Sequence, residues 1–236
     1  MPEIKERPIL FSAPMVRAIL DGRKTVTRRA LNERALKNIG YGVQLGECHE
    51  LPTEGPLHPN SIGYCTDFCP YGQPGNRLWV RETFALLGNE GGVCVDWNDN
   101  LVKGDERAAA RIYRASCTIG CYGLWQVPDK AEWKPETDEL QYEGAWRPSI
   151  HMPRWASRIL LEITDVRLEQ LQDITYEQAA AEGVHRGPLR EWYASDEGGA
   201  CHKYPVPAFR DLWQSVGGDW EANPWVWVVE LKKVTQ

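Results

Sequence analysis

The run NPWVWVVELKKV, at residues 223–234, is the feature that most constrains the fold. Trp225 and Trp227 alternate with Val226 and Val228, and a period of two residues is typical of a β-strand, with the tryptophans on one face and the valines on the other. A strand needs partners in a sheet, and other β-branched or apolar runs supply them. The candidates are ERPILF at 6–11, TVTRR at 25–29, the region RLWVRETFALL at 77–87 and a strand over about 158–167.

Helix signals are fewer than strand signals. Ser12 and Pro14 predict the start of a helix over about 13–21, and Gly22 predicts its end. DITYEQAAAEG reads as a capped helix that begins at Asp173 or Thr175 and stops before Gly183, and PVPAFRDLWQSV reads as a further amphipathic helix. We therefore predict a mixed α+β, β-rich fold.

Two stretches interrupt this pattern. Residues 30–76 are rich in Gly, Pro, Asn and Cys and have little periodicity, and residues 88–146 are irregular with short strand candidates at GVCVDW and AARIYRA. We interpret both as loop insertions into one domain that covers residues 1–236, and the predicted insertion at 30–76 contains no regular element.

Composition limits the partners and the compartment. The net charge is −6, so a role on RNA or DNA would need a local basic patch rather than an overall positive field. No apolar run approaches the roughly 18 residues of a membrane helix, and the first residues lack the apolar core of a signal peptide. We expect a cytoplasmic protein, in bacteria or in a phage-infected host, without a membrane partner; the oligomeric state is left open.

The stretch DGRKTVTRR, at residues 21–29, has two readings. Basic residues at the end of a helix are favoured by the helix dipole, so the stretch can be a solvated helix end. It can equally place Lys24 and Thr27 at the entrance to a strand, where a lysine and a hydroxyl take part in chemistry.

Four blocks in order resemble the ASCH-domain family of the PUA-like superfamily, in a form common in phages and prophages. They are FSAPMVRAILDGRKTVTRR, CPYGQPGNRLWVRETF, ITDVRLEQLQDITYEQAAAEGV and NPWVWVVELKKV. The resemblance implies a small β-barrel with flanking helices and a cleft beside the Gly-x-Lys motif, here Gly22 to Lys24.

One bacterial branch of that family consists of amidohydrolases that remove the acetyl group from 4-acetylcytidine. The resemblance implies that Lys24, Thr27 and Glu182 are the catalytic residues, since they match the branch's lysine, threonine and glutamate. No cofactor is required in that scheme. Thr27 would attack the carbonyl, and lysine can serve as its base when burial or neighbouring cations lower its pKa.

Two groups of side chains are candidates for binding the substrate. The first flanks the lysine and the second lies in the strand RLWVRE, where a tryptophan or arginine plane can stack on a base. These candidates are Arg23, Thr25, Arg28, Arg77, Trp79, Arg81 and Glu82. The ordinary alternatives are a core tryptophan at 79 and a solvated ion pair of Arg81 with Glu82.

Two other functions fit the same residues. PUA-like barrels bind RNA or a flipped modified base, so the chain can be a non-catalytic binding module or a ribonuclease. A third option is a phage assembly or host-interaction protein whose insertions form the working surface.

Seven cysteines are an odd number, which argues against a framework of disulfides. Two pairs with the same spacing offer four thiolates for a structural zinc ion, and the alternative is four reduced, partly buried thiols. The four residues are Cys65, Cys69, Cys117 and Cys121.

Overall fold

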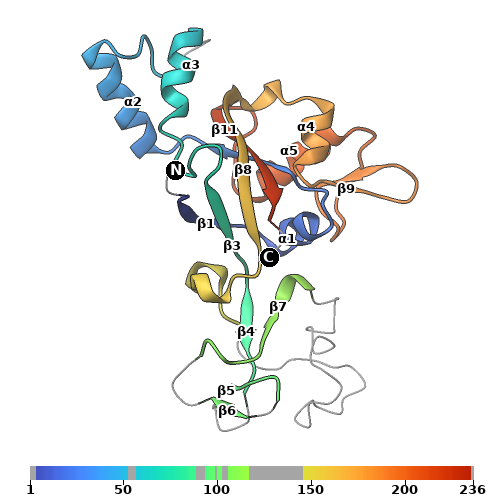
Figure 1. The fold of residues 1–236 in the computed structure, drawn as a ribbon. Helices are drawn as coiled ribbons and strands as arrows, with labels where there is room; N and C mark the ends of the chain where they lie inside the picture. Colours follow the sequence, from blue (N-terminus) through green and yellow to red (C-terminus); the bar gives the residue numbers. More distant parts are fainter. Residues whose placement is uncertain are drawn as a thin grey trace. The chain divides into compact units, whose positions relative to one another are not determined.

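The computed structural model describes residues 4–52, 57–88, 94–98, 100–102, 106–116 and 146–234. A five-stranded sheet with flanking helices dominates them (Figure 1). The strand order is β1 (Glu6–Leu10), β3 (Arg77–Arg81), β8 (Leu160–Gln170), β11 (Trp225–Lys233) and β2 (Val26–Ala30). The prediction of a mixed α+β, sheet-rich fold is confirmed. Within the described ranges the sheet is open, with β1 and β2 at its edges and no closed barrel.

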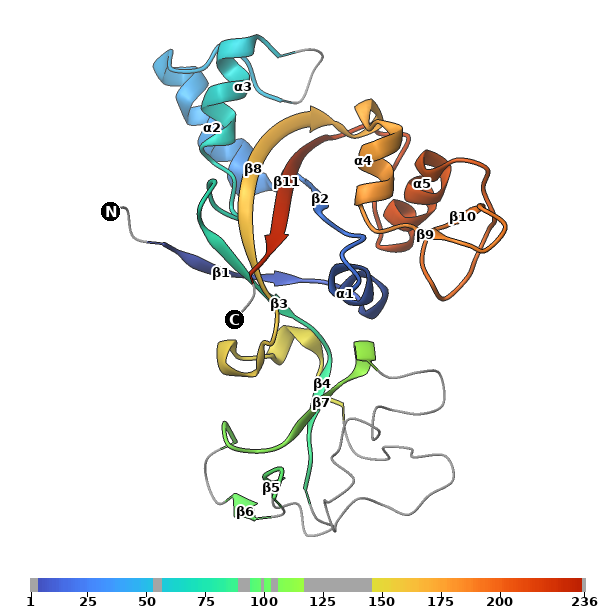
Figure 2. The same cartoon turned by 45° about the vertical axis from the view of Figure 1, so that its right-hand side comes forward.

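The two longest strands form the middle of the sheet. β8 and β11 are antiparallel and lie side by side in Figures 1 and 2, and β2 adds to the other side of β11, also antiparallel. β11 is therefore paired along both of its edges, and Val226–Val229, which point alternately to the two faces of the sheet, are all buried. The register shifts between Glu230 and Leu231, which marks a bulge near the end of β11.

The register sorts the side chains of these three strands onto two faces. Arg28 lies opposite Val228, and Val228 lies opposite Arg167, so these residues share one face, which we call the ionic face. Thr27 lies opposite Val229, and Val229 lies opposite Val166, on the other face. The ionic face also carries Val26, Asp165, Glu169 and Glu230.

Helices α1 (Ala13–Leu20), α4 (Tyr176–Ala181) and α5 (Pro205–Ser215) lie close to their predicted positions. Thr175 caps α4 in a capping box with Gln178, and Gly183 follows the helix end with φ of 94°. In the part of the chain that the structure describes, none of the helices combines the length and apolar character that crossing a membrane takes.

The prediction that residues 30–76 lack regular structure is wrong. They contain α2 (Glu33–Leu45) and α3 (Pro59–Thr66), which lie beside each other in both views (Figures 1 and 2). Local signals explain both helices, because Asn32 caps α2, Gly46 ends it in the left-handed region, and Pro59 begins α3. Gly42 of α2 allows the close approach, since a Cβ there would lie 2.2 Å from the Tyr64 hydroxyl oxygen of α3.

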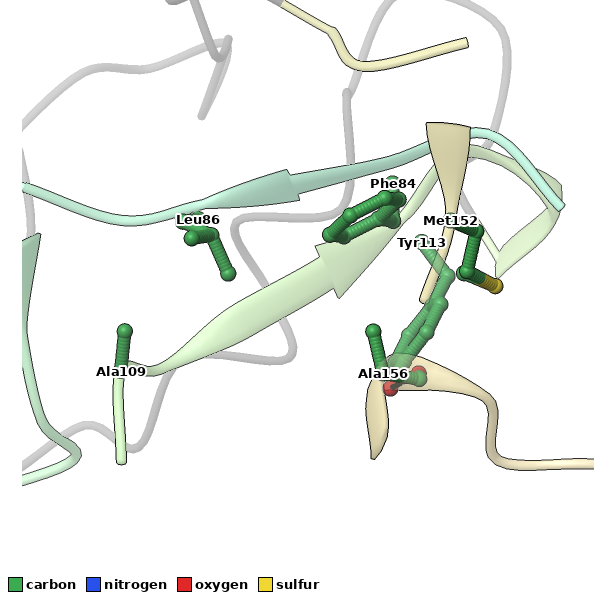
Figure 3. Packing of buried hydrophobic residues seen from close by; sticks show 6 residues of the cluster. All are labelled: Phe84, Leu86, Ala109, Tyr113, Met152 and Ala156. Carbon is green, nitrogen blue, oxygen red and sulfur yellow. Dashed lines mark hydrogen bonds between the residues drawn. The ribbon is translucent and has the colours of Figure 1, made fainter. Parts of the chain in front are cut away.

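The chain divides into two compact units. The first unit comprises residues 1–7, 18–78 and 159–236, and the second comprises residues 8–17 and 79–158. In the second unit, β4 (Phe84–Leu86) pairs with β7 (Arg111–Tyr113) and β5 (Cys94–Val95) with β6 (Leu101–Val102). One of its apolar clusters, shown in Figure 3, is formed by Phe84, Leu86, Ala109, Tyr113, Met152 and Ala156.

Candidate functional site

Lys24 is placed by the end of a helix and the start of a strand. After α1, Gly22 takes a φ of 74°, and the backbone N–H groups of Arg23 and Lys24 both donate to the Ala18 carbonyl. The chain then enters β2 at Val26. The stretch DGRKTVTRR thus ends a helix, as the first reading held, and it also carries its lysine into the interior, where 5% of the residue is exposed.

Glu182 reaches the same point from the end of α4. It forms an isolated β-bridge with Lys24, and the backbone N–H of Thr25 donates to the Ala181 carbonyl. Gly183 is required beside it, because a Cβ there would lie 3.0 Å from the Cβ atoms of both Ala18 and Lys24. Two segments far apart in the sequence are therefore joined by backbone contacts as well as by charge.

The Lys24 ammonium has three acceptors around it. Nζ donates to Glu182 Oε2 at 2.8 Å, to the Glu182 carbonyl at 2.7 Å and to the Val26 carbonyl at 2.8 Å. Both side chains of the ion pair are 3% exposed. Three donors with three acceptors satisfy an ammonium group, so the buried charge is compensated.

Arg28 holds the second oxygen of the same carboxylate. Its Nη1 donates to Glu182 Oε1 at 3.3 Å, while Nη2 donates to Glu169 Oε2 at 2.9 Å and to Gln178 Oε1 at 2.8 Å. The side chain is fully buried. Arg28, predicted to bind substrate, lies inside the protein and orients Glu182.

Burial lowers the pKa of Lys24 from its ordinary value of 10.5. Glu182 opposes this shift by its charge and its hydrogen bond, whereas Arg29 and Arg28 add to it. The net direction brings the pKa of this lysine closer to neutrality, as a residue that exchanges a proton requires.

An open groove of about 270 Å³ adjoins this cluster. Val26 and Gln178 line the groove and also belong to the cluster. The Val26 carbonyl accepts a hydrogen bond from Lys24, and the Gln178 amide oxygen accepts one from Arg28. Five polar side chains line the groove: Thr25, Thr164, Glu177, Gln178 and Glu230. Thr25, predicted to bind substrate, is exposed there.

Thr27 lies apart from the hydrogen bonds of this cluster. It precedes Arg28 in β2, so its side chain points to the other face of the sheet, with Val229 and Val166. No hydrogen bond between described residues joins its hydroxyl to Lys24 or Glu182. Of the three residues predicted to be catalytic, the structure brings together Lys24 and Glu182.

The remaining predicted residues have partners of their own. Arg23 donates to the Gly183 carbonyl at 3.2 Å and pairs with Asp21 at 3.1 Å, at the edge of the cluster. Arg77 lines a different groove of the first unit, beside the turn at Gly75 and Asn76.

Trp79, Arg81 and Glu82 belong to the second unit. The Arg81 guanidinium lies 5.7 Å from the centre of the Trp79 ring. Glu82 is 1% exposed, and Arg158 donates to both of its carboxylate oxygens, at 2.9 and 3.0 Å. A carboxylate bound in this way is a structural ion pair rather than a ligand of substrate, so the solvated pair of Arg81 with Glu82 is replaced by a buried pair with Arg158.

Two members of the cluster were not predicted as site residues. Gln178 is signalled by the T-x-x-Q capping box, which fixes its amide at the first turn of α4. Glu169 could be found only from the register of β8 against β11, since it shares the face of Arg28 there.

The predicted zinc ligands are only partly described. Cys65 and Cys69 are buried near α3, while Cys117 and Cys121 lie outside the described residues. Burial raises the pKa of Cys65 to about 12. No set of three or more His, Cys, Asp or Glu in the described ranges has the arrangement of a metal site, and zinc stays a prediction.

Comparison with known proteins identifies no relative of the chain. No protein-family model, no curated protein and no solved structure matches the chain. The buried Lys24–Glu182–Arg28 cluster and its neighbouring groove are therefore the basis for a function.

Proposed function

We propose that the chain is an amidohydrolase that removes an acyl group from a modified base such as 4-acetylcytidine, within a PUA-like fold. The buried ion pair of Lys24 and Glu182 beside the groove carries this proposal. A buried lysine with a lowered pKa next to a groove is typical of an acid–base site. The ASCH resemblance of the surrounding motifs supports the choice of substrate.

In this mechanism Lys24 and Glu182 handle the proton. The oxygen of a water molecule adds to the acyl carbon, the C–N bond breaks, and the proton lost by the water is passed to the leaving amine. The products are the carboxylic acid and the free amino group of the base. We assign the attack to water because Thr27 lies on the opposite face from Arg28, which holds Glu182.

The test is hydrolysis of 4-acetylcytidine and a panel of acylated nucleosides by the purified protein. Lys24→Met and Glu182→Gln should each lower kcat by at least about 100-fold, in the range that general acid–base groups contribute. Lys232→Met, at an exposed lysine of β11, is the matched control and should leave kcat unchanged. Absence of turnover by the wild-type protein on every substrate would refute the proposal.

A second candidate is a binding module for RNA or a modified base, without turnover. It is favoured by the three acceptors on Lys24 Nζ and by the 3% exposure of this side chain, which suit a structural ammonium. Oligonucleotide binding that weakens linearly with the logarithm of salt concentration, together with no hydrolysis, would establish this function.

A further inference from the structure

The orientation of the Gln178 side-chain amide is fixed from two sides. Its Oε1 accepts from the backbone N–H of Thr175 at 3.0 Å and from Arg28 Nη2 at 2.8 Å. Both partners are donors only, so the oxygen must face them and the NH₂ group must point away. The capping box and the buried arginine thus determine which end of the amide is presented outward.

Gln178 lines the groove, and no hydrogen bond of its Nε2 occurs within the described residues. The buried polar atoms of the described residues that lack a hydrogen bond include Arg28 Nε but not Gln178 Nε2. Gln178 Nε2 has no hydrogen bond among the described residues and is not buried, so solvent can reach it. The amide nitrogen is therefore an accessible donor held in a fixed direction.

The other polar groups of the groove differ from Gln178. Thr25 and Thr164 carry hydroxyls that rotate freely, and Glu177 and Glu230 are acceptors, with Glu230 Oε1 already accepting from Arg167 at 2.6 Å. An amide NH₂ beside carboxylates suits a neutral ligand that presents a carbonyl oxygen next to an N–H group. An acylamino group on a base has this pattern.

We infer that Gln178 Nε2 donates a hydrogen bond to the acyl carbonyl oxygen of the ligand in this groove, which makes Gln178 a specificity residue. The inference rests on the proposed function for the identity of the ligand. It goes beyond that function because it names the group that distinguishes an acylated base from an alkylated one.

The variant Gln178→Glu isolates this donor. Glutamate at the same position keeps both acceptor bonds, since it completes a capping box equally well and accepts from Arg28, but it has no N–H to offer. Gln214→Glu, at an exposed position of α5, introduces the same chemical change as a control. Gln178→Met, which also lacks an N–H, replaces the glutamate variant should that one fail to fold.

The ligands are 4-acetylcytidine and N4-ethylcytidine, in which a methylene replaces the carbonyl. If the wild type hydrolyses the acetyl compound, kcat/KM should fall about tenfold in Gln178→Glu, with the inhibition constant of N4-ethylcytidine unchanged. If the wild type does not hydrolyse 4-acetylcytidine, titration calorimetry should show that it binds this compound about tenfold more tightly than N4-ethylcytidine. This preference should vanish in Gln178→Glu.

The outcomes separate the two proposals. Turnover with equal kcat/KM in wild type and Gln178→Glu overturns the role of Gln178 and leaves the hydrolase intact. A carbonyl preference that depends on Gln178, without turnover, supports the donor and refutes the hydrolase. Binding of neither ligand overturns both.

Discussion

Each of the two units buries a glutamate against arginine, but the two glutamates are held differently. In the second unit, the Glu82 carboxylate pairs with one described residue, Arg158, whose side chain is 26% exposed and lies 4.0 Å from the centre of the Tyr113 ring. In the first unit, Glu182 accepts from Lys24 and from Arg28, and both of these are almost completely buried. The Glu82–Arg158 pair is isolated, and its arginine is partly exposed to solvent. Glu182, in contrast, belongs to a network of buried charges beside a groove. The difference teaches that burial of a carboxylate alone does not mark a site; the number of its partners and an adjoining groove do.

Removing each carboxylate should give the largest contrast. Glu182→Ala leaves two buried cations without their shared partner, and we expect a loss of about 3–5 kcal/mol in the free energy of unfolding. Glu82→Ala leaves Arg158 able to turn toward water, and the expected loss is about 1–2 kcal/mol. Urea denaturation measures both, with the exposed Glu221→Ala as a control that stays within about 0.5 kcal/mol. Equal losses at both sites would remove the distinction between the clusters.

Replacing each arginine by lysine should give the next largest contrast. Arg28 serves three acceptors in different directions, which a lysine cannot reproduce, so Arg28→Lys should cost about 2–3 kcal/mol. Arg158→Lys should cost about 1 kcal/mol, since one carboxylate can still be reached by an ammonium. The midpoint of thermal unfolding measures the stability of both variants. A larger loss of stability in Arg158→Lys than in Arg28→Lys would contradict the role of Arg28 in the network of the first unit.

The pH dependence of stability should show a smaller effect, which comes from Lys24 in the first unit. Burial lowers the pKa of folded Lys24 below its unfolded value of 10.5. Between these two values the unfolded chain binds a proton that the folded chain does not, so the free energy of unfolding should rise with pH. The slope from this group is at most about 1.4 kcal/mol per pH unit.

The slope is measured by urea titrations from about pH 8 to pH 10 on wild type and Lys24→Met. Subtracting the two curves removes the contribution of the other titrating groups. A difference curve that is flat, or that falls with rising pH, would show that Glu182 outweighs burial.

The smallest effect is expected at Thr27, which shares β2 with Arg28 but belongs to neither cluster. Thr27→Val removes a hydroxyl that has no hydrogen bond among the described residues, so stability should change by less than about 1 kcal/mol. We also expect kcat/KM to stay within about twofold. A loss of 100-fold or more in a variant of normal stability would assign the attack to Thr27 and not to water.

Local signals predicted much of the fold. The alternation at Trp225–Val228, the cap at Thr175 and the glycines at 22 and 183 each determine a structure within a few residues, and each was found from the sequence. The helices at 33–45 and 59–66 were not predicted although local signals exist: Ala35, Ile39 and Val43 recur every four residues, and Asn32 and Pro59 mark the two starts.

The site was predictable only in part, for a physical reason. Lys24 and Glu182 came from a resemblance of motifs, and their contact depends on segments 158 residues apart. The burial of Arg28 and the direction of Thr27 depend on the register between β2 and β11, which no local pattern in the sequence determines. The burial of Glu82 likewise depends on a distant residue, Arg158, which lies 76 positions further along the chain.

The pairing of β2 with β11 has a consequence for synthesis on the ribosome. Val26–Ala30 leave the exit tunnel long before Trp225–Lys233, and among the described strands β2 pairs with β11 alone. Glu182 is translated before β11, so its contact with Lys24 does not wait for that strand, but β2 cannot take its place in the sheet until β11 has emerged. Because Glu230 and Leu231 line the groove, the groove can form only after β11 has been translated.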